Sequence, residues 1–248
     1  MGGGTPSSHS VFTTLRWKEG QVAWLNEHLK RLEKHAERLG IQWPENFLES
    51  LHSSMIHGEG NLCRIQLCKD GEITLTLRES NYSPSPLVAT SQEAPRFPAN
   101  VQGTKHDEWG GYIEARKQSI GKGADIGLLV HDGAVVDGDH CTPILLDRDG
   151  VAFAPAPEGG GVDSITLQLL KPAIEASGIP FRTARLTERL IGRASEIIVV
   201  GTGVGVAWLN EIDGQEVGKG SPGPLFTVCE KAFYDSLGDA WTQLGDAR

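Results

Sequence analysis

The feature that most constrains this chain is a proline-rich stretch over residues 80–103, which separates two differently patterned halves. Its prolines are Pro84, Pro86, Pro95 and Pro98. Proline fixes its own φ and lacks a backbone N–H, so such a stretch disfavours continuous helix or central strand. We expect an irregular connector here that includes one extended strand around residues 87–90, and a domain boundary near residue 100.

This boundary predicts three parts of the chain. Residues 1–10 are rich in glycine, serine and proline, and we expect a disordered N-terminus there. Residues 11–100 would form a small N-terminal α/β domain, and residues 101–248 a larger C-terminal α/β domain. A chain of 248 residues can bury a substantial core without disulfides or metals.

In the N-terminal half, the strongest signal is a helix over residues 25–39. Its apolar residues recur at the spacing of one buried helical stripe, and Gly40 follows as a C-cap. A second helix is expected over about residues 44–57. Alternating apolar residues on both sides of two turns, Lys18-Glu19-Gly20 and Asp70-Gly71, predict two hairpins.

The C-terminal half alternates predicted strands and helices. Residues 196–200 form a near-continuous apolar run, typical of a buried strand, and Gly201-Thr202-Gly203 closes it. Pro172 lies inside a predicted helix that ends near Ser177, and so predicts a kink. Further strands are expected at residues 126–131, 134–137, 143–146, 151–154 and 181–186, and further helices at 112–122, 186–194 and 223–237.

Composition excludes some classes of function. The formal net charge is -9 and no lysine or arginine run is present, which argues against nucleic-acid binding. No apolar run approaches the length of a membrane span, so we expect a cytoplasmic protein. The cysteines lack the spacing of a metal site, and we expect free thiols without a metal. They are Cys63, Cys68, Cys141 and Cys229.

Several short motifs carry chemistry only when they are taken together. A lone lysine before His-Asp-Glu is most often a solvated loop charge, and HLKRL by itself is an amphipathic helix. In chain order the motifs are FTTLR at 12–16, HLKRL at 28–32, Lys105-His106 with Trp109, GAD at 123–125, VDG at 136–138, SIT at 164–166 and Gly201-Thr202. This ordered set resembles the class IV aminotransferases, which include branched-chain and D-amino-acid aminotransferases and 4-amino-4-deoxychorismate lyase.

The resemblance runs from about residue 11 to 233 and implies a two-domain α/β fold with pyridoxal 5'-phosphate between the domains, commonly in a homodimer. Lys105 matches the lysine whose amine holds the cofactor's aldehyde as a Schiff base. Once the substrate displaces that amine, it can move protons as general base and acid. His106 beside it could tune the lysine or fill a hydrogen-bond gap.

The resemblance also assigns groups to the two ends of the cofactor. Asp137 matches the carboxylate that keeps the pyridine nitrogen protonated. The family uses glutamate there, so the cofactor would sit closer, a water would bridge or the contact would be weaker; a solvated turn aspartate is the alternative. Thr142 likewise replaces the usual asparagine.

For the phosphate, Arg31 matches the family's arginine, Ile165 and Thr166 match helix-start amides, and Thr202 matches a hydroxyl. Arg31 could instead be a surface partner of Glu27 or His35. Thr166 and Thr202 could instead be a helix cap and a turn residue.

Thr14 and Arg16 lie on a predicted strand and could bind a substrate carboxylate. FTTLR and the Lys105-His106 motif are closer to the lyase branch of the family. The resemblance therefore favours a lyase that converts 4-amino-4-deoxychorismate to 4-aminobenzoate and pyruvate for folate synthesis. The alternatives are an aminotransferase acting on branched-chain or D-amino acids, and a non-catalytic homologue.

Overall fold

The computed structural model describes residues 9–80 and 85–244, and the chain divides into two compact units. Among the described residues, the first unit comprises 9–80, 96–109 and 237–244, and the second comprises 85–95 and 110–236. Residues 96–109 therefore group with the first unit, although the sequence places a boundary near residue 100. This matters because the segment includes Lys105.

The first unit is built on a six-stranded sheet with the order β16-β2-β1-β4-β5-β3. Residues 1–8 of the expected disordered N-terminus lie outside the described residues. The expectation is wrong for Ser10, which begins the first strand because it pairs with Cys68. The strands are β1 (Ser10–Lys18), β2 (Gln21–Ala23), β3 (Ile56–His57), β4 (Leu62–Cys68), β5 (Ile73–Arg78) and β16 (Trp241–Gln243).

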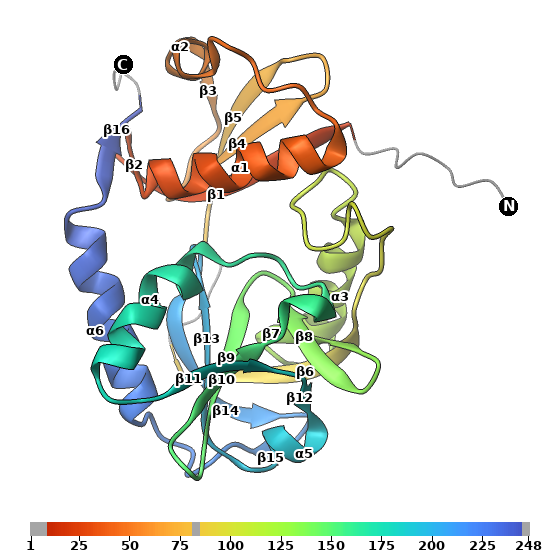
Figure 1. Ribbon diagram of the computed structural model, residues 1–248, viewed down its shortest axis with the longest axis vertical. Helices are drawn as coiled ribbons and strands as arrows, with labels where there is room; N and C mark the ends of the chain where they lie inside the picture. Colours follow the sequence, from red (N-terminus) through yellow and green to blue (C-terminus); the bar gives the residue numbers. More distant parts are fainter. Residues whose placement is uncertain (1–8, 81–84, 245–248) are drawn as a thin grey trace, which may run out of the picture. The chain divides into compact units, whose positions relative to one another are not determined.

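Two helices pack against one face of this sheet (Figure 1). The expected helix α1 (Leu25–Leu39) is confirmed, and it ends at Gly40, whose φ of 67 places it in the left-handed region. Helix α2 (Phe47–Ser53) is shorter than expected, because Ser54 turns the backbone to an extended conformation and β3 follows. Alternate residues of β1, β4 and β5, such as Leu15, Ile65 and Leu75, form a core with both helices.

The second unit contains a larger sheet, with the order β11-β10-β9-β13-β14-β6-β7-β8-β12, and β15 pairs with β14. Its strands are β6 (Leu87–Glu93), β7 (Ile126–His131), β8 (Ala134–Gly138), β9 (Thr142–Asp147), β10 (Ala152–Pro155), β11 (Phe181–Ala184), β12 (Leu186–Thr187), β13 (Ala194–Gly201), β14 (Gly205–Ile212) and β15 (Gln215–Glu216). The buried strand expected at 196–200 is confirmed within β13. Residues 81–84 of the expected connector lie outside the described residues.

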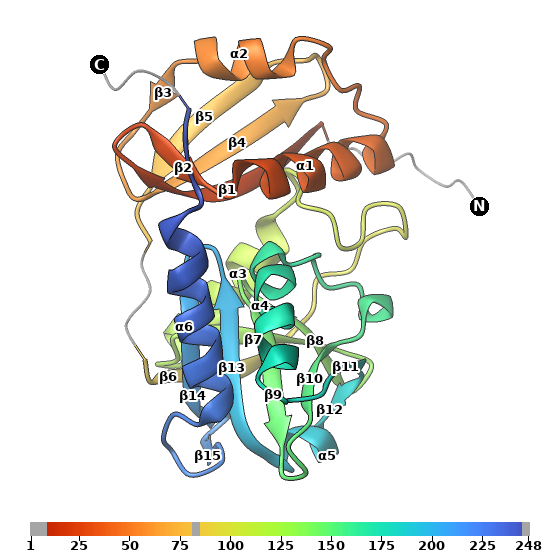
Figure 2. The same cartoon turned by 60° about the vertical axis from the view of Figure 1, so that its left-hand side comes forward.

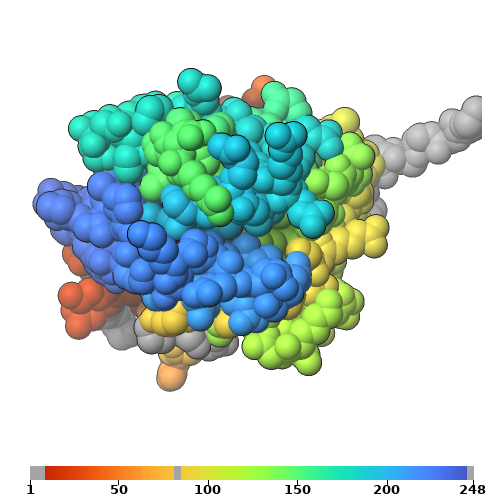
Figure 3. Space-filling model, turned by 90° about the horizontal axis from the view of Figure 1, so that it is seen from below, coloured from red at the N-terminus to blue at the C-terminus, as the bar shows by residue number. Residues whose placement is uncertain are grey.

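The helices of the second unit are α3 (Gly110–Gly121), α4 (Ile165–Ala176), α5 (Glu188–Ile191) and α6 (Pro224–Gly238). The predicted helix over 186–194 is largely wrong, because Leu186 pairs with Val135 and Ala194 begins β13, which leaves one helical turn. Helices α4 and α6 run alongside β13 (Figure 2). The later residues of this unit, drawn in blue, form a continuous surface beside α4, drawn in teal (Figure 3).

One charged residue inside the buried run has a structural explanation. Glu196 on β13 is only 4% exposed, and its carboxylate accepts hydrogen bonds from the main-chain N–H groups of Gly223, Leu225 and Phe226. These donors surround the first turn of α6, where N–H groups lack partners within the helix and attract negative charge. Glu196 therefore caps α6 and joins that helix to the sheet.

Across residues 9–80 and 85–244, none of the helices combines the length and apolar character needed to cross a membrane.

Candidate functional site

The main chain around Lys105 is paired with the edge of β1 that does not contact β4. Phe12 donates its N–H to the carbonyl of Lys105 at 3.0 Å, and Asp107 donates to the carbonyl of Ser10 at 3.2 Å. From the other direction, the N–H of Lys105 donates to Nδ1 of His35 on α1 at 3.1 Å. Both peptide groups of Lys105 are thus held, one by β1 and one by α1.

The side chain of Lys105 lies against two aromatic rings. Its Nζ is 4.6 Å from the centroid of the Trp109 ring and 5.3 Å from that of Phe12. The two rings meet edge to face, with centroids 5.3 Å apart. A cation over aromatic faces is attracted by their quadrupoles, and the side chain is half-buried. Lys105 is therefore not the fully solvated loop charge that a lone lysine suggests.

His106 supports this arrangement rather than pointing into solvent. It is 1% exposed, and its ring packs edge to face against Phe97 at 4.5 Å and Trp109 at 6.2 Å between centroids. Burial lowers the pKa of His106, although Glu108 and Asp107 oppose this. The ring of His106 therefore packs against both Phe97 and Trp109.

Thr13 joins Arg31 to the sheet. Nη2 of Arg31 donates to Oγ1 of Thr13 at 2.9 Å, and the same oxygen lies 2.7 Å from Nδ1 of His28. Because this oxygen accepts from Arg31, its own hydrogen is available for His28 Nδ1, which places the imidazole proton on Nε2. Arg31 is only 8% exposed. Arg31 is therefore not at the surface, where the alternative of a surface partner of Glu27 or His35 would place it.

His28 and His35 are buried on the same face of α1 as Arg31, since three and four residues separate them. Desolvation is the largest cause that lowers both pKa values, and the charges of Arg31 and Lys105 add to it; the pKa of His28 falls well below its usual value and that of His35 falls to about 2. Neither Nε2 atom has a hydrogen-bond partner among the described residues. Two neutral imidazoles therefore lie beside two cations.

The opposite face of β1 carries Phe12, Thr14 and Arg16, because side chains alternate along a strand. Thr14 pairs in register with Arg64 of β4, whose guanidinium lies 3.9 Å from the centroid of the Phe12 ring. Burial, followed by the charge of Arg78, lowers the pKa of Arg64 to about 10. The two expected substrate-binding residues therefore share a face with Arg64 and with an aromatic ring that contacts Lys105.

In the second unit, Asp137 is a buried residue near the end of β8. It is 5% exposed, and its Oδ2 accepts the N–H of Val162 at 2.8 Å. Its Oδ1 accepts the N–H of Gly138 at 3.0 Å and the hydroxyl of Thr142 at 3.4 Å. The alternative of a solvated turn aspartate is wrong.

A glycine brings Val162 close to Asp137. A Cβ on Gly161 would lie 2.3 Å from the carbonyl oxygen of Val136, a distance that no side chain tolerates. A Cβ on Gly159 would lie 2.9 Å from Val136 Cγ1. The segment 159–162 can therefore lie directly on β8 only because it lacks these side chains.

The expected phosphate residues of the second unit lie at a helix start and a strand end. Ile165 and Thr166 open α4 and are 3% and 2% exposed. The helix cap is Ser164, whose hydroxyl accepts the N–H of Leu167, so the alternative role of Thr166 as the cap is wrong. Thr202 lies in the turn between β13 and β14, as its alternative interpretation predicts.

Sequence reasoning missed the pair Asp139 and His140, in the loop after Asp137. Asp139 is 1% exposed and accepts the N–H of Gly127 at 3.0 Å, and its other oxygen lies 2.7 Å from Nδ1 of His140. The main chain of His140 approaches Gly201, whose Cβ would lie 3.1 Å from the His140 carbonyl. This loop therefore places Asp137 and Thr142 near the strand end that precedes Thr202.

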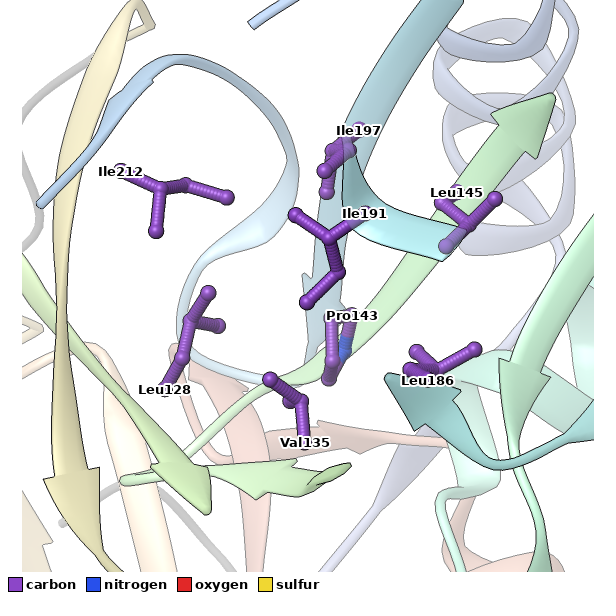
Figure 4. A pocket seen from close by; sticks show the side chains of 8 residues that line it. All are labelled: Leu128, Val135, Pro143, Leu145, Leu186, Ile191, Ile197 and Ile212. Atoms are coloured by element: carbon purple, nitrogen blue, oxygen red, sulfur yellow. The ribbon is translucent and has the colours of Figure 1, made fainter. Parts of the chain in front are cut away.

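A small cavity in the second unit is a packing gap (Figure 4). Its volume is about 10 Å³, and its lining contains only apolar side chains. A cavity of this size is at the lower limit for one water and offers that water no polar partner. The lining residues are Leu128, Val135, Pro143, Leu145, Leu186, Ile191, Ile197 and Ile212.

Comparison with known proteins identifies relatives over most of the chain. The family model "Amino-transferase class IV" matches residues 10–212. A D-alanine aminotransferase from Listeria monocytogenes is 23% identical over 265 residues, which cover 96% of this chain and 90% of that protein.

Solved structures share the fold at lower identity. A T.th. branched-chain amino acid aminotransferase, solved with pyridoxamine 5'-phosphate, has a TM-score of 0.76 at 20% identity and covers 95% of this chain and 90% of its own. A candidate 4-amino-4-deoxychorismate lyase from Legionella pneumophila has a TM-score of 0.75 at 16% identity, with coverage of 92% and 91%. At this identity the likeness shows the fold alone.

The buried histidines predict a steep loss of stability in acid. In the unfolded chain His35 binds a proton near pH 6.5, whereas in the folded protein its pKa is about 2. The unfolded state therefore binds more protons in this window, and stability falls as the pH decreases, by up to ~1.4 kcal/mol per pH unit per histidine. In urea unfolding between about pH 6 and pH 4, His35→Asn should show a shallower loss than the wild type.

The matched control is His52→Asn, which changes an exposed histidine on α2 and should leave the slope unchanged. A wild-type slope in His35→Asn would contradict the buried, neutral state assigned to His35.

Proposed function

Because the chain belongs to the class IV aminotransferase family, we propose that it is a pyridoxal-phosphate-dependent lyase. The reaction would convert 4-amino-4-deoxychorismate to 4-aminobenzoate and pyruvate, a step of folate synthesis. The cofactor, when bound, supplies an electron sink for the carbanion that proton removal leaves on the substrate. We further propose that the enzyme acts as a homodimer in the cytoplasm, as the family resemblance implies.

The chemistry of the donors fits this cofactor. Pyridoxal phosphate requires an amine for its aldehyde, cationic and neutral donors for its dianionic phosphate, and a carboxylate for its ring nitrogen. Lys105, Arg31 and Asp137 supply these three groups, and each is buried or half-buried. Arg31 donates to the neutral hydroxyl of Thr13, a contact that orients the guanidinium without cancelling its charge.

Lys105 would hold the cofactor's aldehyde and then act on the substrate. Freed by the incoming substrate amine, its Nζ would remove the proton from the carbon that bears this amine. The bond between the ring carbon and the ether oxygen would then break, so that the ring becomes aromatic and enolpyruvate leaves. Enolpyruvate would take up a proton to give pyruvate, which balances the proton accepted by Lys105. The hydrogen bonds to the Lys105 main chain support this role, because they fix the base of its side chain.

Arg31 would bind the phosphate, with help from the amides of Ile165 and Thr166 and the hydroxyl of Thr202. Arg31 is fixed by Thr13, which suits a guanidinium that must meet phosphate oxygens in a defined orientation. The start of α4 adds N–H groups that lack partners within the helix.

Asp137 would hold the proton on the cofactor's ring nitrogen. Gly138, Val162 and Thr142 donate to its carboxylate. Such donors favour the ionised form of a buried carboxyl group, and an ionised carboxylate is the form that a protonated ring nitrogen requires. These neighbours also favour the interpretation that the site has been built around the shorter aspartate.

The face of β1 with Arg16 and Thr14 is the observation that favours the lyase over an amino-acid aminotransferase. 4-Amino-4-deoxychorismate carries two carboxylates, whereas a branched-chain amino acid carries one. Arg64 lies beside Thr14 on the same face. Arg78 is close enough to lower the pKa of Arg64. Several guanidinium groups on one face suit a dianionic substrate.

The second candidate is an aminotransferase, which the D-alanine aminotransferase relatives favour. Such an enzyme needs a keto acid as a second substrate, whereas the lyase does not. The buried carboxylate of Asp137 and the fixed main chain of Lys105 argue against a non-catalytic homologue.

A product assay separates these functions. With 4-amino-4-deoxychorismate and no keto acid, the purified holoenzyme should release pyruvate and 4-aminobenzoate in equal amounts, because the lyase consumes a single substrate. Lys105→Ala should abolish this release, and the matched control Lys122→Ala, at an exposed lysine, should retain it. Turnover that appears only with an added keto acid would identify the aminotransferase instead.

Substitution of Asp137 tests its proposed role. Asp137→Asn keeps the shape but loses the charge, and kcat should fall by about 10²-fold or more. Asp137→Glu should also lower kcat, because the longer side chain displaces the carboxylate from the amides of Val162 and Gly138. Steady-state kinetics with Asp149→Asn, at an exposed turn, provides the control. A rate increase in Asp137→Glu would refute a site built around aspartate.

A further inference from the structure

We propose that His35 is a positioning residue for Lys105, whose main chain it holds in the conformation that allows the amine to reach the cofactor's aldehyde. This inference rests on the proposed role of Lys105. His35 was not assigned any role by sequence, except as a possible partner of Arg31.

The contact is direct and well defined. The N–H of Lys105 donates to Nδ1 of His35 at 3.1 Å, across 70 positions of sequence. Lys105 lies outside the helices and named strands. The imidazole therefore supplies the acceptor that regular secondary structure provides elsewhere.

The carbonyl of Lys105 explains why loss of the His35 acceptor should have a large effect on the position of the lysine. Its carbonyl accepts from Phe12 of β1, so β1 holds the C-terminal side of the residue and His35 holds the N-terminal side. Loss of His35 would leave the N–H of Lys105 without its acceptor, so the N-terminal side of the residue could shift while β1 still holds the carbonyl of Lys105 and the N–H of Asp107. The Nζ atom would then leave its place beside Phe12 and Trp109.

Burial first, and the surrounding positive charges second, keep His35 in the neutral form that accepts a hydrogen bond. Arg31, Lys34 and Arg38 on its own helix and Lys105 on the facing segment are the charged groups that act on it, and all four disfavour a second positive charge. A protonated imidazole would donate from Nδ1 and could not accept from Lys105. The neutral ring therefore serves as a fixed acceptor that adds no charge beside the lysine.

The experiment compares two ligands that differ only where Lys105 acts. Pyridoxal phosphate has an aldehyde that can bond to the lysine, whereas pyridoxamine phosphate has an amine that cannot. Affinity for each is measured by equilibrium dialysis with the wild type, His35→Leu, His35→Asn and Lys105→Ala. Asn places its Oδ1 near the position of Nδ1 and so keeps an acceptor, whereas Leu has none.

We expect His35→Leu to weaken pyridoxal phosphate binding by about tenfold, the effect of losing the hydrogen bond of the half-buried Lys105 N–H. Pyridoxamine phosphate should change by less than about twofold, because Arg31 and Thr13 remain in place. His35→Asn should restore the affinity for pyridoxal phosphate. His52→Leu, at an exposed position, should match the wild type with both ligands. If His35→Leu does not fold, His35→Met removes the acceptor at similar volume.

Equal weakening of both ligands in His35→Leu would indicate a purely structural histidine and overturn the inference, as would unchanged binding of both. Failure of His35→Asn to restore binding would also overturn it. The proposed function fails separately: if the wild type and Lys105→Ala bind pyridoxal phosphate equally, Lys105 has no covalent role and both proposals fall. If Lys105→Ala alone loses the preference for the aldehyde, only the inference about His35 falls.

Discussion

The pairing of residues 105–107 with the edge of β1 is the interaction on which the proposed roles of the first unit's residues depend. Both edges and both faces of β1 make contacts. One edge is hydrogen-bonded to β4 and the other to the Lys105 segment. One face presents Thr13 to Arg31, and the opposite face presents Thr14 and Arg16. A single strand therefore fixes a lysine, an arginine and a cationic face. Because main-chain hydrogen bonds to β1 and the imidazole of His35 set this arrangement, side-chain changes other than at His35 should have little effect on the position of Lys105.

In the second unit, a glycine-containing segment helps to hold the carboxylate of Asp137. Gly161 lets the segment 159–162 lie against β8, and the N–H of Val162 then meets the Asp137 carboxylate. Asp139 secures the following loop through the N–H of Gly127. The buried aspartate is therefore held by main-chain donors, whose positions depend on glycine and on strand register. A longer carboxylate at this position would need a different backbone to keep these hydrogen bonds.

The parts of this fold that can be predicted from sequence are those with local causes. The helix over 25–39 follows from its apolar stripe and from Gly40, and β13 follows from its apolar run. Motif order singled out Lys105, Arg31 and Asp137. The two hydrogen bonds that hold the main chain of Lys105 could not be predicted, because their partners come from α1 and β1. Lys105 itself lies in a loop, which carries no periodic signal. The role of Glu196 was hidden for the same reason, since its donors lie about thirty positions away.

Lys105 is proposed to be the residue that bonds to the cofactor, and covalent trapping tests this role most directly. Borohydride treatment of the holoenzyme followed by peptide mass analysis fixes the cofactor's mass on the lysine that carries it. We predict that this mass appears on the peptide containing Lys105 and nowhere else. A cofactor mass on Lys117, Lys122 or another lysine, or no adduct in a protein loaded with pyridoxal phosphate, would contradict it.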